Sequence, residues 1–231
     1  MVIARSRIWP ALMLIAVVLF LLLAWVKGTS AGESFDRAVL SALQNQGESV
    51  VPLGPAWLRE AFRDLTALGS ISVLALATLI GVAWLLLSGF WRISLLTAAV
   101  IAGGAAMSFL LKGYFSQPRP DLLSEPTQVF TSSFPSSHAM ASLVTWMTLA
   151  WLLALGRCDR TARGYLLGTA VLITLVAGCS RLYLGVHWPS DVLAGWAAGL
   201  AWLSLCGWAL QGRLAIWLAP ELGYLQSGSQ D

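Results

Sequence analysis

Six stretches of mostly apolar residues, each long enough to cross a lipid bilayer, constrain the fold of this 231-residue chain more than any other feature. A membrane-spanning helix needs about 20 such residues, because the hydrocarbon core of a bilayer is about 30 Å thick. The six stretches are residues 8–26, 70–88, 93–111, 138–156, 165–184 and 190–211. They predict an all-α, polytopic membrane protein, a six-transmembrane-helix bundle in which residues 1–231 form a single membrane-embedded domain.

The low content of charged residues excludes the soluble classes of protein. Only 11% of the residues are charged and 58% are hydrophobic, whereas about a quarter are charged in soluble domains. Disorder requires low hydrophobicity and high charge, so it is excluded too. The net charge is +3, but the basic residues are scattered without a stripe, which argues against a nucleic-acid partner. Cys158, Cys179 and Cys206 have no CxxC spacing, and we interpret them as small apolar residues, not as a disulfide framework or a zinc site.

Positive charges in the loops predict the orientation of the chain. The loops on the two sides of the membrane would carry equal numbers of Lys and Arg in total, so the orientation is inferred from the short loops alone. Arg157, Arg160 and Arg163 cluster in the tight turn between the fourth and fifth stretches, which places this turn and both termini in the cytoplasm. The first stretch has an alternative interpretation as a signal peptide cleaved near Thr29-Ser30-Ala31. Its apolar run of about 19 residues is longer than the apolar region of a signal peptide, which usually has about 7–15 residues, so we favour a span that is retained.

The polar region 27–69 contains two amphipathic patterns, which predict helices on the outer face of the bundle. The apolar face of the first helix, which Gly47 would end, consists of Phe35, Val39, Ala42 and Leu43. The apolar face of the second helix, which Gly69 would end, consists of Leu58, Ala61, Phe62, Leu65 and Leu68. The two helices would either lie on the membrane surface or pack on the bundle as a lid, and the sequence does not separate these alternatives.

The first of three polar clusters follows the third apolar stretch and reads KGYFSQPRP, from Lys112 to Pro120. Pro118 and Pro120 restrict the backbone around Arg119. A lysine and an arginine seven residues apart offer a point charge and a planar fork, which suit a phosphate group. Taken alone, the cluster is more typical of basic residues that anchor a helix end. Asp121, directly after it, is best interpreted as a solvated loop acid.

The second and third clusters each precede a predicted span. Phe134-Pro135-Ser136-Ser137-His138 leads into the fourth span, and free amides at a helix start bind anions. Taken alone, His138 is better interpreted as a capping residue. The third cluster, SRLYLGVHWPSD, joins the fifth and sixth spans and contains Arg181, His187 and Asp191. Asp191 lies about one helical turn after His187, so its carboxylate can orient the imidazole and leave the other ring nitrogen free to attack.

Together the clusters place both histidines of the chain and three cations on one face of the membrane. His187 would be the nucleophile and His138 the acid, while Lys112, Arg119, Arg181 and backbone amides would hold a phosphate. These groups are sufficient for phosphoryl transfer by positioning and charge neutralisation. Neither a metal nor another cofactor is expected, because the site has no cluster of carboxylates and both histidines have other roles.

The three clusters resemble the motifs of the type-2 phosphatidic acid phosphatase (PAP2) superfamily, K-x6-R-P, P-S-G-H and S-R-x5-H-x3-D. The resemblance covers residues 112–191, about a third of the chain. It implies that His187 becomes a phosphohistidine, that Asp191 orients it and that His138 protonates the leaving oxygen. It also implies that the phosphate ligands are Lys112, Arg119, Ser136 and Arg181. Ser137 departs from the motif, which has a glycine there. Ser137 keeps the backbone amide that binds phosphate but adds a Cβ and disfavours positive φ.

The resemblance implies a lipid phosphatase that removes the terminal phosphate of a lipid mono- or diphosphate. Its partners would be that substrate and the membrane lipids. Candidate substrates are undecaprenyl diphosphate, phosphatidylglycerophosphate, phosphatidic acid and lipid A phosphates. The expected location is a bacterial inner (cytoplasmic) membrane, with the active site facing the periplasm or outside.

Three alternatives were weighed. A phosphotransferase with a lipid or sugar acceptor would use the same residues. A transporter would place charges inside the spans, but the first, second and fourth spans have none. A soluble vanadate-dependent haloperoxidase shares the site motifs, and the six apolar stretches argue against it.

Overall fold

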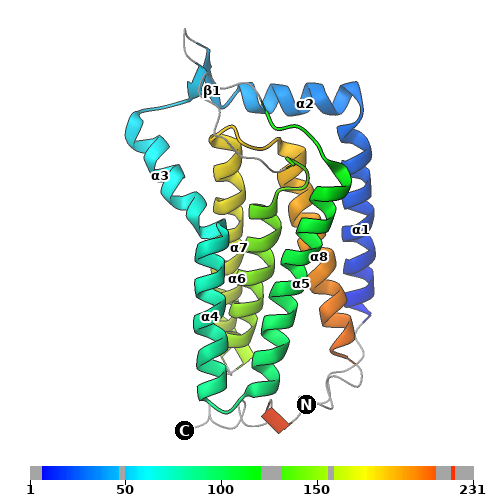
Figure 1. Ribbon diagram of the computed structural model, residues 1–231, viewed down its shortest axis with the longest axis vertical. Helices are drawn as coiled ribbons and strands as arrows, with labels where there is room; N and C mark the ends of the chain where they lie inside the picture. The colour runs from blue at the N-terminus through cyan, green and yellow to red at the C-terminus, as the bar shows by residue number, and fades with distance from the viewer. Residues whose placement is uncertain (1–6, 47–49, 121–131, 156–158, 212–219, 222–231) are drawn as a thin grey trace.

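Six long helices run side by side and form the bundle that the apolar stretches predict (Figure 1). The computed structural model describes residues 7–46, 50–120, 132–155, 159–211 and 220–221. The long helices are α1 (Ile8–Lys27), α4 (Ile71–Leu87), α5 (Trp91–Phe115), α6 (Ser137–Leu155), α7 (Arg160–Tyr183) and α8 (Pro189–Ala209). The start of α1 and the end of α8 lie at the same end of the bundle, as an even number of crossings requires.

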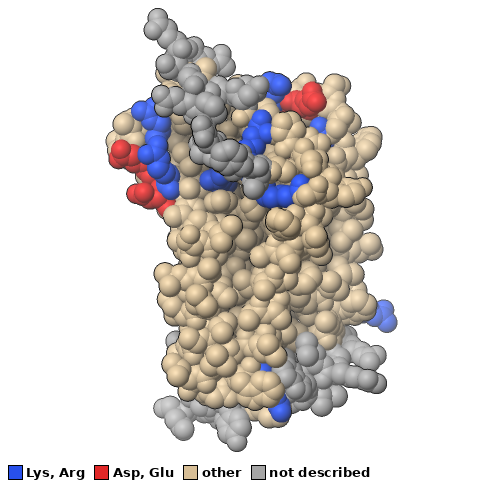
Figure 2. Space-filling model, in the orientation of Figure 1, with Lys and Arg blue, Asp and Glu red and all other residues tan. Residues whose placement is uncertain are grey.

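The distribution of charge shows where the bilayer surrounds the bundle. Lys, Arg, Asp and Glu gather toward the two ends, and a broad uncharged band separates them (Figure 2). Five helices, α1, α5, α6, α7 and α8, are long and apolar enough to cross a membrane on their own. Helix α4 qualifies together with the preceding segment Ala56–Gly69, from which it bends by 46°. The chain is an integral membrane protein, and its long helices match the six predicted spans.

Two helices extend beyond the predicted spans. Helix α5 runs from Trp91 to Phe115, past both ends of the stretch 93–111, and α7 begins at Arg160, before residue 165. Asp159 caps α7, because its carboxylate oxygens accept hydrogen bonds from the amides of Thr161 (3.0 Å) and Ala162 (3.1 Å). The apolar pattern thus marks the part of a helix inside the bilayer, and the helix continues into polar sequence.

The region between the first two spans folds onto the end of the bundle opposite the start of α1 (Figure 1). It contains α2 (Ser30–Ser41), a hairpin of β1 (Gln44–Gln46) and β2 (Val50–Pro52), α3 (Ala56–Thr66) and a 3-10 turn, η1 (Ala67–Gly69). The two strands are antiparallel, with Asn45 opposite Val51. The predicted end of the second amphipathic helix at Gly69 is confirmed, because the 3-10 turn continues α3 to that residue.

The prediction for the first amphipathic helix is wrong at its end. Helix α2 ends at Ser41, because the next residues pair with β-branched Val50 and Val51 in the hairpin. Gly47, the predicted stop, lies outside the described residues. Phe35, on the apolar face of α2, is 52% exposed, whereas the polar Asp36 is 3% exposed. The Asp36 carboxylate therefore lies on the face of α2 that packs against the bundle, because it accepts a hydrogen bond from the amide of Ser190 at the start of α8.

Both outer helices contact the bundle. Leu40 of α2 is fully buried. On α3, the ring of Phe62 stacks on Tyr183 of α7 with 4.2 Å between ring centroids. The amphipathic helices thus pack on the end of the bundle at the place where the polar clusters lie.

Glycines on α8 allow α6 and α8 to approach closely. A Cβ at Gly195 would lie 2.5 Å from the backbone oxygen of Ser136, and one at Gly199 would lie 3.2 Å from that of Met140. This Gly-xxx-Gly spacing is typical of close helix crossings in membranes. The contact continues to the helix starts, where the amide of Ser136 donates to the backbone oxygen of Asp191 at 2.9 Å. The crossing therefore brings the second and third sequence clusters together.

Candidate active site

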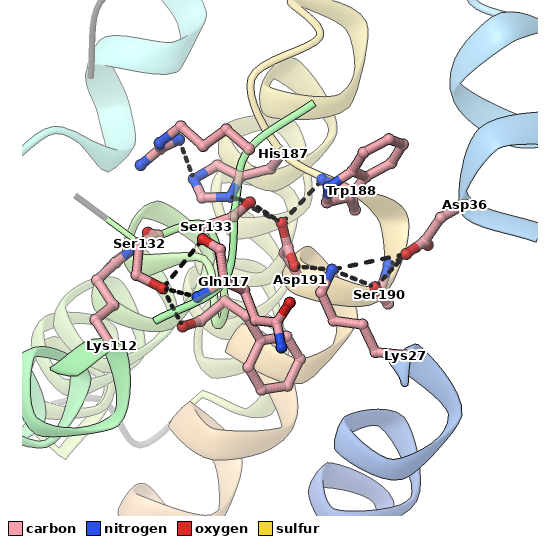
Figure 3. A network of polar contacts seen from close by, with 12 residues as sticks. Lys27, Asp36, Lys112, Gln117, Ser132, Ser133, His187, Trp188, Ser190 and Asp191 are labelled. Atoms are coloured by element: carbon pink, nitrogen blue, oxygen red, sulfur yellow. Dashed lines mark hydrogen bonds and ion pairs between the residues drawn. The ribbon is translucent and has the colours of Figure 1, made fainter. Parts of the chain in front are cut away.

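His187 and Asp191 form a buried pair at the start of α8. His187 is 1% exposed and Asp191 is fully buried, and Nδ1 of the imidazole lies 3.3 Å from Oδ2 of the carboxylate. The amide of Trp188 donates to the same oxygen at 3.0 Å, and the hydroxyl of Ser133 donates to it as well (Figure 3). Pro189 opens the helix without needing an amide partner, and Asp191 reaches back to cap its first turn. The predicted partnership of His187 and Asp191 is therefore present in the structure.

The other ring nitrogen of His187 faces a cation. An Nη of Arg119 lies 3.2 Å from Nε2 and also donates to the backbone oxygen of Val186 at 2.8 Å. A guanidinium has only donors, so Nε2 must present its lone pair, and the ring proton belongs on Nδ1, toward Asp191. Burial lowers the pKa of His187 to about 4, although Asp191 opposes this effect. His187 is thus a neutral imidazole at pH 7 with its lone pair directed at the cations.

The three predicted cations lie close enough together to interact electrostatically, Arg119 and Arg181 with His187 and Lys112 with both arginines. Lys112, in the last turn of α5, is 8% exposed and donates to the backbone oxygen of Ser132. The turn after it is tight, because Ser116 adopts a φ of 44° and ends α5. Arg181, also 8% exposed, donates to Thr66 at 3.2 Å and so connects α7 to α3. Burial lowers the pKa of Arg119 from its ordinary value.

Two buried polar atoms of the expected phosphate ligands have no hydrogen-bond partner among the residues that the structure describes, Oγ of Ser136 and Nε of Arg181. Ser136 is fully buried directly before α6. A buried donor without a partner costs about 1–3 kcal/mol. An anion with several acceptor oxygens, such as phosphate, would accept from both groups.

His138 lies in the first turn of α6, half-buried. The positive charges of Arg181, Lys112 and Arg119 act on it electrostatically, as does His187. A Cβ at Gly69 would lie 3.3 Å from the Cβ and Cδ2 of His138, so the end of the outer segment packs closely against this ring. The structure therefore brings His138 to the same site as His187.

Ser137 is the first residue of α6. Among the described residues other than glycine, only Ser116 has a positive φ. The expected penalty of a serine at the motif's glycine position is therefore absent, because the backbone of Ser137 does not need glycine's freedom. Asp121, the loop acid, lies outside the described residues.

The sequence analysis missed four polar residues that surround Asp191: Lys27, Asp36, Ser133 and Ser190. Ser133 and Ser190 stand beside or inside motifs, so their positions were a usable signal. Lys27 and Asp36 lie more than 150 residues from Asp191 in the chain, and a lysine at the end of a span is typical of a simple anchor. Within the described ranges, no three His, Cys, Asp or Glu side chains are grouped so that they could hold a metal ion.

Comparisons with known proteins agree with this architecture. The PAP2 superfamily matches residues 91–214. Phosphatidylglycerophosphatase B of Bacillus subtilis is 31% identical over 184 residues, which cover 78% of this chain and 86% of that protein. An undecaprenyl-diphosphatase of Sulfolobus acidocaldarius is 36% identical over 95 residues, which cover 39% of this chain and 38% of that one.

Two solved structures share the fold. The transmembrane PAP2-type phosphatidylglycerolphosphate phosphatase of Bacillus subtilis superposes with a TM-score of 0.74 at 28% identity, covering 84% of this chain and 94% of the other. LpxE of Aquifex aeolicus has a TM-score of 0.52 at 22% identity, covering 74% and 93%, which shows the fold alone. The family match spans more than half of the chain and includes all three polar clusters, so the chain belongs to the PAP2 superfamily and is a membrane-embedded lipid phosphatase.

Proposed function

We propose that this protein removes the terminal phosphate of a lipid mono- or diphosphate through a phosphohistidine on Nε2 of His187, without a metal. The observation that carries the proposal is the two-sided environment of this ring. Asp191 holds Nδ1 and Nε2 points at Arg119, while among the described residues two expected phosphate ligands, the Ser136 hydroxyl and Arg181 Nε, have no hydrogen-bond partner. A phosphate there would complete the hydrogen bonding of the pocket and lie in line for attack.

In the first step, the lone pair of Nε2 attacks phosphorus, an N–P bond forms and the P–O bond to the lipid breaks. His138 gives its proton to the leaving oxygen. Lys112, Arg119 and Arg181 stabilise the charge that develops on the phosphoryl oxygens. The proton on Nδ1 stays between His187 and Asp191, so the imidazolium character of the phosphorylated ring is stabilised by the carboxylate.

In the second step, water attacks the phosphohistidine. His138, now neutral, accepts a proton from the water, the N–P bond breaks, and inorganic phosphate leaves. His138 is then protonated again and His187 is again a neutral nucleophile, which closes the cycle.

The substrate would place its acyl or prenyl tail among the helices and its phosphate at the end of the bundle. Phosphatidylglycerophosphate and undecaprenyl diphosphate lead the candidates, because relatives named for activity on them are similar to this chain. We further propose that the site faces the periplasm or outside of an inner membrane and that both termini are cytoplasmic. The start of α1 and the end of α8 lie opposite the site, at the end that carries Arg160 and Arg163.

The experiment is phosphate release by the purified full-length protein from a panel of lipid mono- and diphosphates, with excess chelator in a parallel series. We expect release from at least one lipid and the same rate with chelator. His187→Ala should remove essentially all turnover. With a phosphate-labelled lipid, label should remain on the protein after denaturation in alkali, in which an N–P bond survives. Substantial turnover by His187→Ala would overturn the proposal.

A further inference from the structure

Lys27, the last residue of α1, contacts the carboxylate that orients His187. Its Nζ lies 2.6 Å from Oδ1 of Asp191, and the two side chains are 10% and 0% exposed. The two oxygens of Asp191 have separate partners, because Oδ2 accepts from Trp188, Ser133 and His187 and Oδ1 accepts from Lys27 (Figure 3). A fully buried carboxylate is stable only with a paired charge and satisfied hydrogen bonds.

The lysine is itself held in place from several elements. Its ammonium donates to the Ser190 hydroxyl at 3.1 Å and lies 3.7 Å from the Asp36 carboxylate on α2. Asp36 in turn accepts from the amide of Ser190 at 2.9 Å and from its hydroxyl at 2.5 Å. The rings of Phe134 and Trp188 lie 5.6 Å and 5.9 Å from Nζ. Such a network fixes the ammonium to one position, which a flexible anchor at a membrane surface does not need.

We propose that Lys27 is a positioning residue of the His187–Asp191 pair: it holds Oδ1 of Asp191 so that Oδ2 meets Nδ1 of His187. Asp36 and Ser190 hold the lysine and so connect the α1–α2 junction to the active site. The inference rests on the proposed function, in which His187 is the nucleophile.

The charge of Lys27 also affects the basicity of His187. The charged and titratable groups around His187 are Asp191 from α8, Arg119 from the loop after α5, Lys112 from the last turn of α5, Arg181 from α7 and His138 from α6, with Lys27 of α1 behind Asp191. Asp191 stabilises the imidazolium, and Lys27 offsets part of that negative charge. Removing the ammonium therefore raises the pKa of His187. A lysine that only supported the fold would change stability and leave this pKa where it is.

The test compares Lys27→Met with Arg63→Met in the purified full-length protein, on the lipid that wild type hydrolyses fastest. Arg63 is exposed on α3, so its substitution removes the same charge from the same end of the molecule. For Lys27→Met we expect kcat to fall by about 10- to 100-fold with little change in KM, as for other losses of orientation. The acid limb of its kcat/KM profile should move up by about one pH unit. Lys27→Arg, which keeps the charge, should keep the wild-type limb and recover part of kcat.

Each outcome decides the inference. A Lys27→Met protein with wild-type kcat and acid limb overturns it, and so does a fall in kcat equal to that of Arg63→Met. Gel filtration and thermal melting show whether Lys27→Met folds. If it does not, Ser190→Ala is used instead, because this change removes a hydroxyl partner of Lys27 and leaves every charge in place. A loss of about three- to tenfold in kcat with an unmoved limb then supports the inference, and wild-type kcat overturns it.

Including His187→Ala separates this inference from the proposed function. If His187→Ala is inactive and Lys27→Met behaves like wild type, only the role of Lys27 is overturned. If His187→Ala stays active, the nucleophile is wrong and both proposals are overturned.

Discussion

The two sides of the His187 ring differ in how completely their polar groups are satisfied. On the Nδ1 side, which we call the orienting side, Asp191 has partners on both oxygens, from Ser133, Trp188 and Lys27. On the Nε2 side, which we call the phosphate side, the ring faces Arg119, and two expected phosphate ligands, Ser136 Oγ and Arg181 Nε, have no partner among the described residues. The orienting side is a closed network that holds the ring, whereas the phosphate side keeps bonding capacity for an anion. This difference predicts that the two sides respond differently to substitution.

The largest effect after loss of the nucleophile is expected on the orienting side. Asp191→Asn keeps the shape but removes the charge that fixes the Nδ1–H tautomer, and in comparable pairs such a change lowers kcat by about 10⁴-fold. Single-turnover kinetics should show slow formation of the phosphoenzyme. Asp64→Asn, exposed on α3, is the matched control and should behave like wild type. A loss below tenfold would mean that Asp191 does not orient the ring.

On the phosphate side, Arg181→Gln should lower kcat/KM by about 10²- to 10³-fold, as for loss of one group that stabilises transition-state charge. Inorganic phosphate or vanadate should inhibit this variant more weakly than wild type. Arg63→Gln provides the control for loss of charge. Unchanged inhibition by both anions would show that Arg181 does not contact the phosphate.

Substitutions on the two sides of the ring should move the acid limb of the pH profile in opposite directions. Because burial holds the pKa of His187 near 4, kcat/KM should fall only as the pH drops through this value, when the nucleophile becomes protonated. In the complex, the negative charge of the bound phosphate favours a protonated His138, and kcat should fall at the other limb as His138 loses this proton, which gives a bell-shaped profile. Asp191→Asn removes a charge that raises this pKa and should move the acid limb down, whereas Arg181→Gln should move it up. Shifts in the same direction would contradict the assignment of the two sides.

The smallest effect is expected at Ser137, where the family motif has glycine. The backbone there has no positive φ, so Ser137→Gly should change kcat/KM by less than about threefold, or under about 0.7 kcal/mol of barrier. Rates on lipid phosphates with different chain lengths test this expectation. A large gain on one lipid would show that the Cβ of Ser137 restricts the substrate.

The parts of this molecule that could be predicted from sequence are those with local or repeated signals. Span-length apolar runs identified all six long helices, and motif spacing identified the residues that converge at the site. The inner face of α2 was not predicted, because apolar periodicity cannot show that Asp36 faces inward to bond with Ser190. The role of Lys27 was invisible for the same reason, since its partner lies 164 residues away and only the packing of α1 on α8 brings them together. Polar contacts across helices depend on the tertiary arrangement and leave little trace in a single sequence.

The close crossing at Gly195 and Gly199 has a consequence for how the site can vary. His138 lies in the first turn of α6 and His187 lies just before α8, so the spacing of these two helices helps to set the distance between the proposed acid and the proposed nucleophile. A methyl group at Gly195 would meet the backbone of Ser136 and not a side chain that could rotate away. Helices α6 and α8 are already in contact at Gly195 and cannot move closer together. We therefore expect differences in substrate size to be accommodated by the segment from α2 to η1 and by the lipid-facing helices.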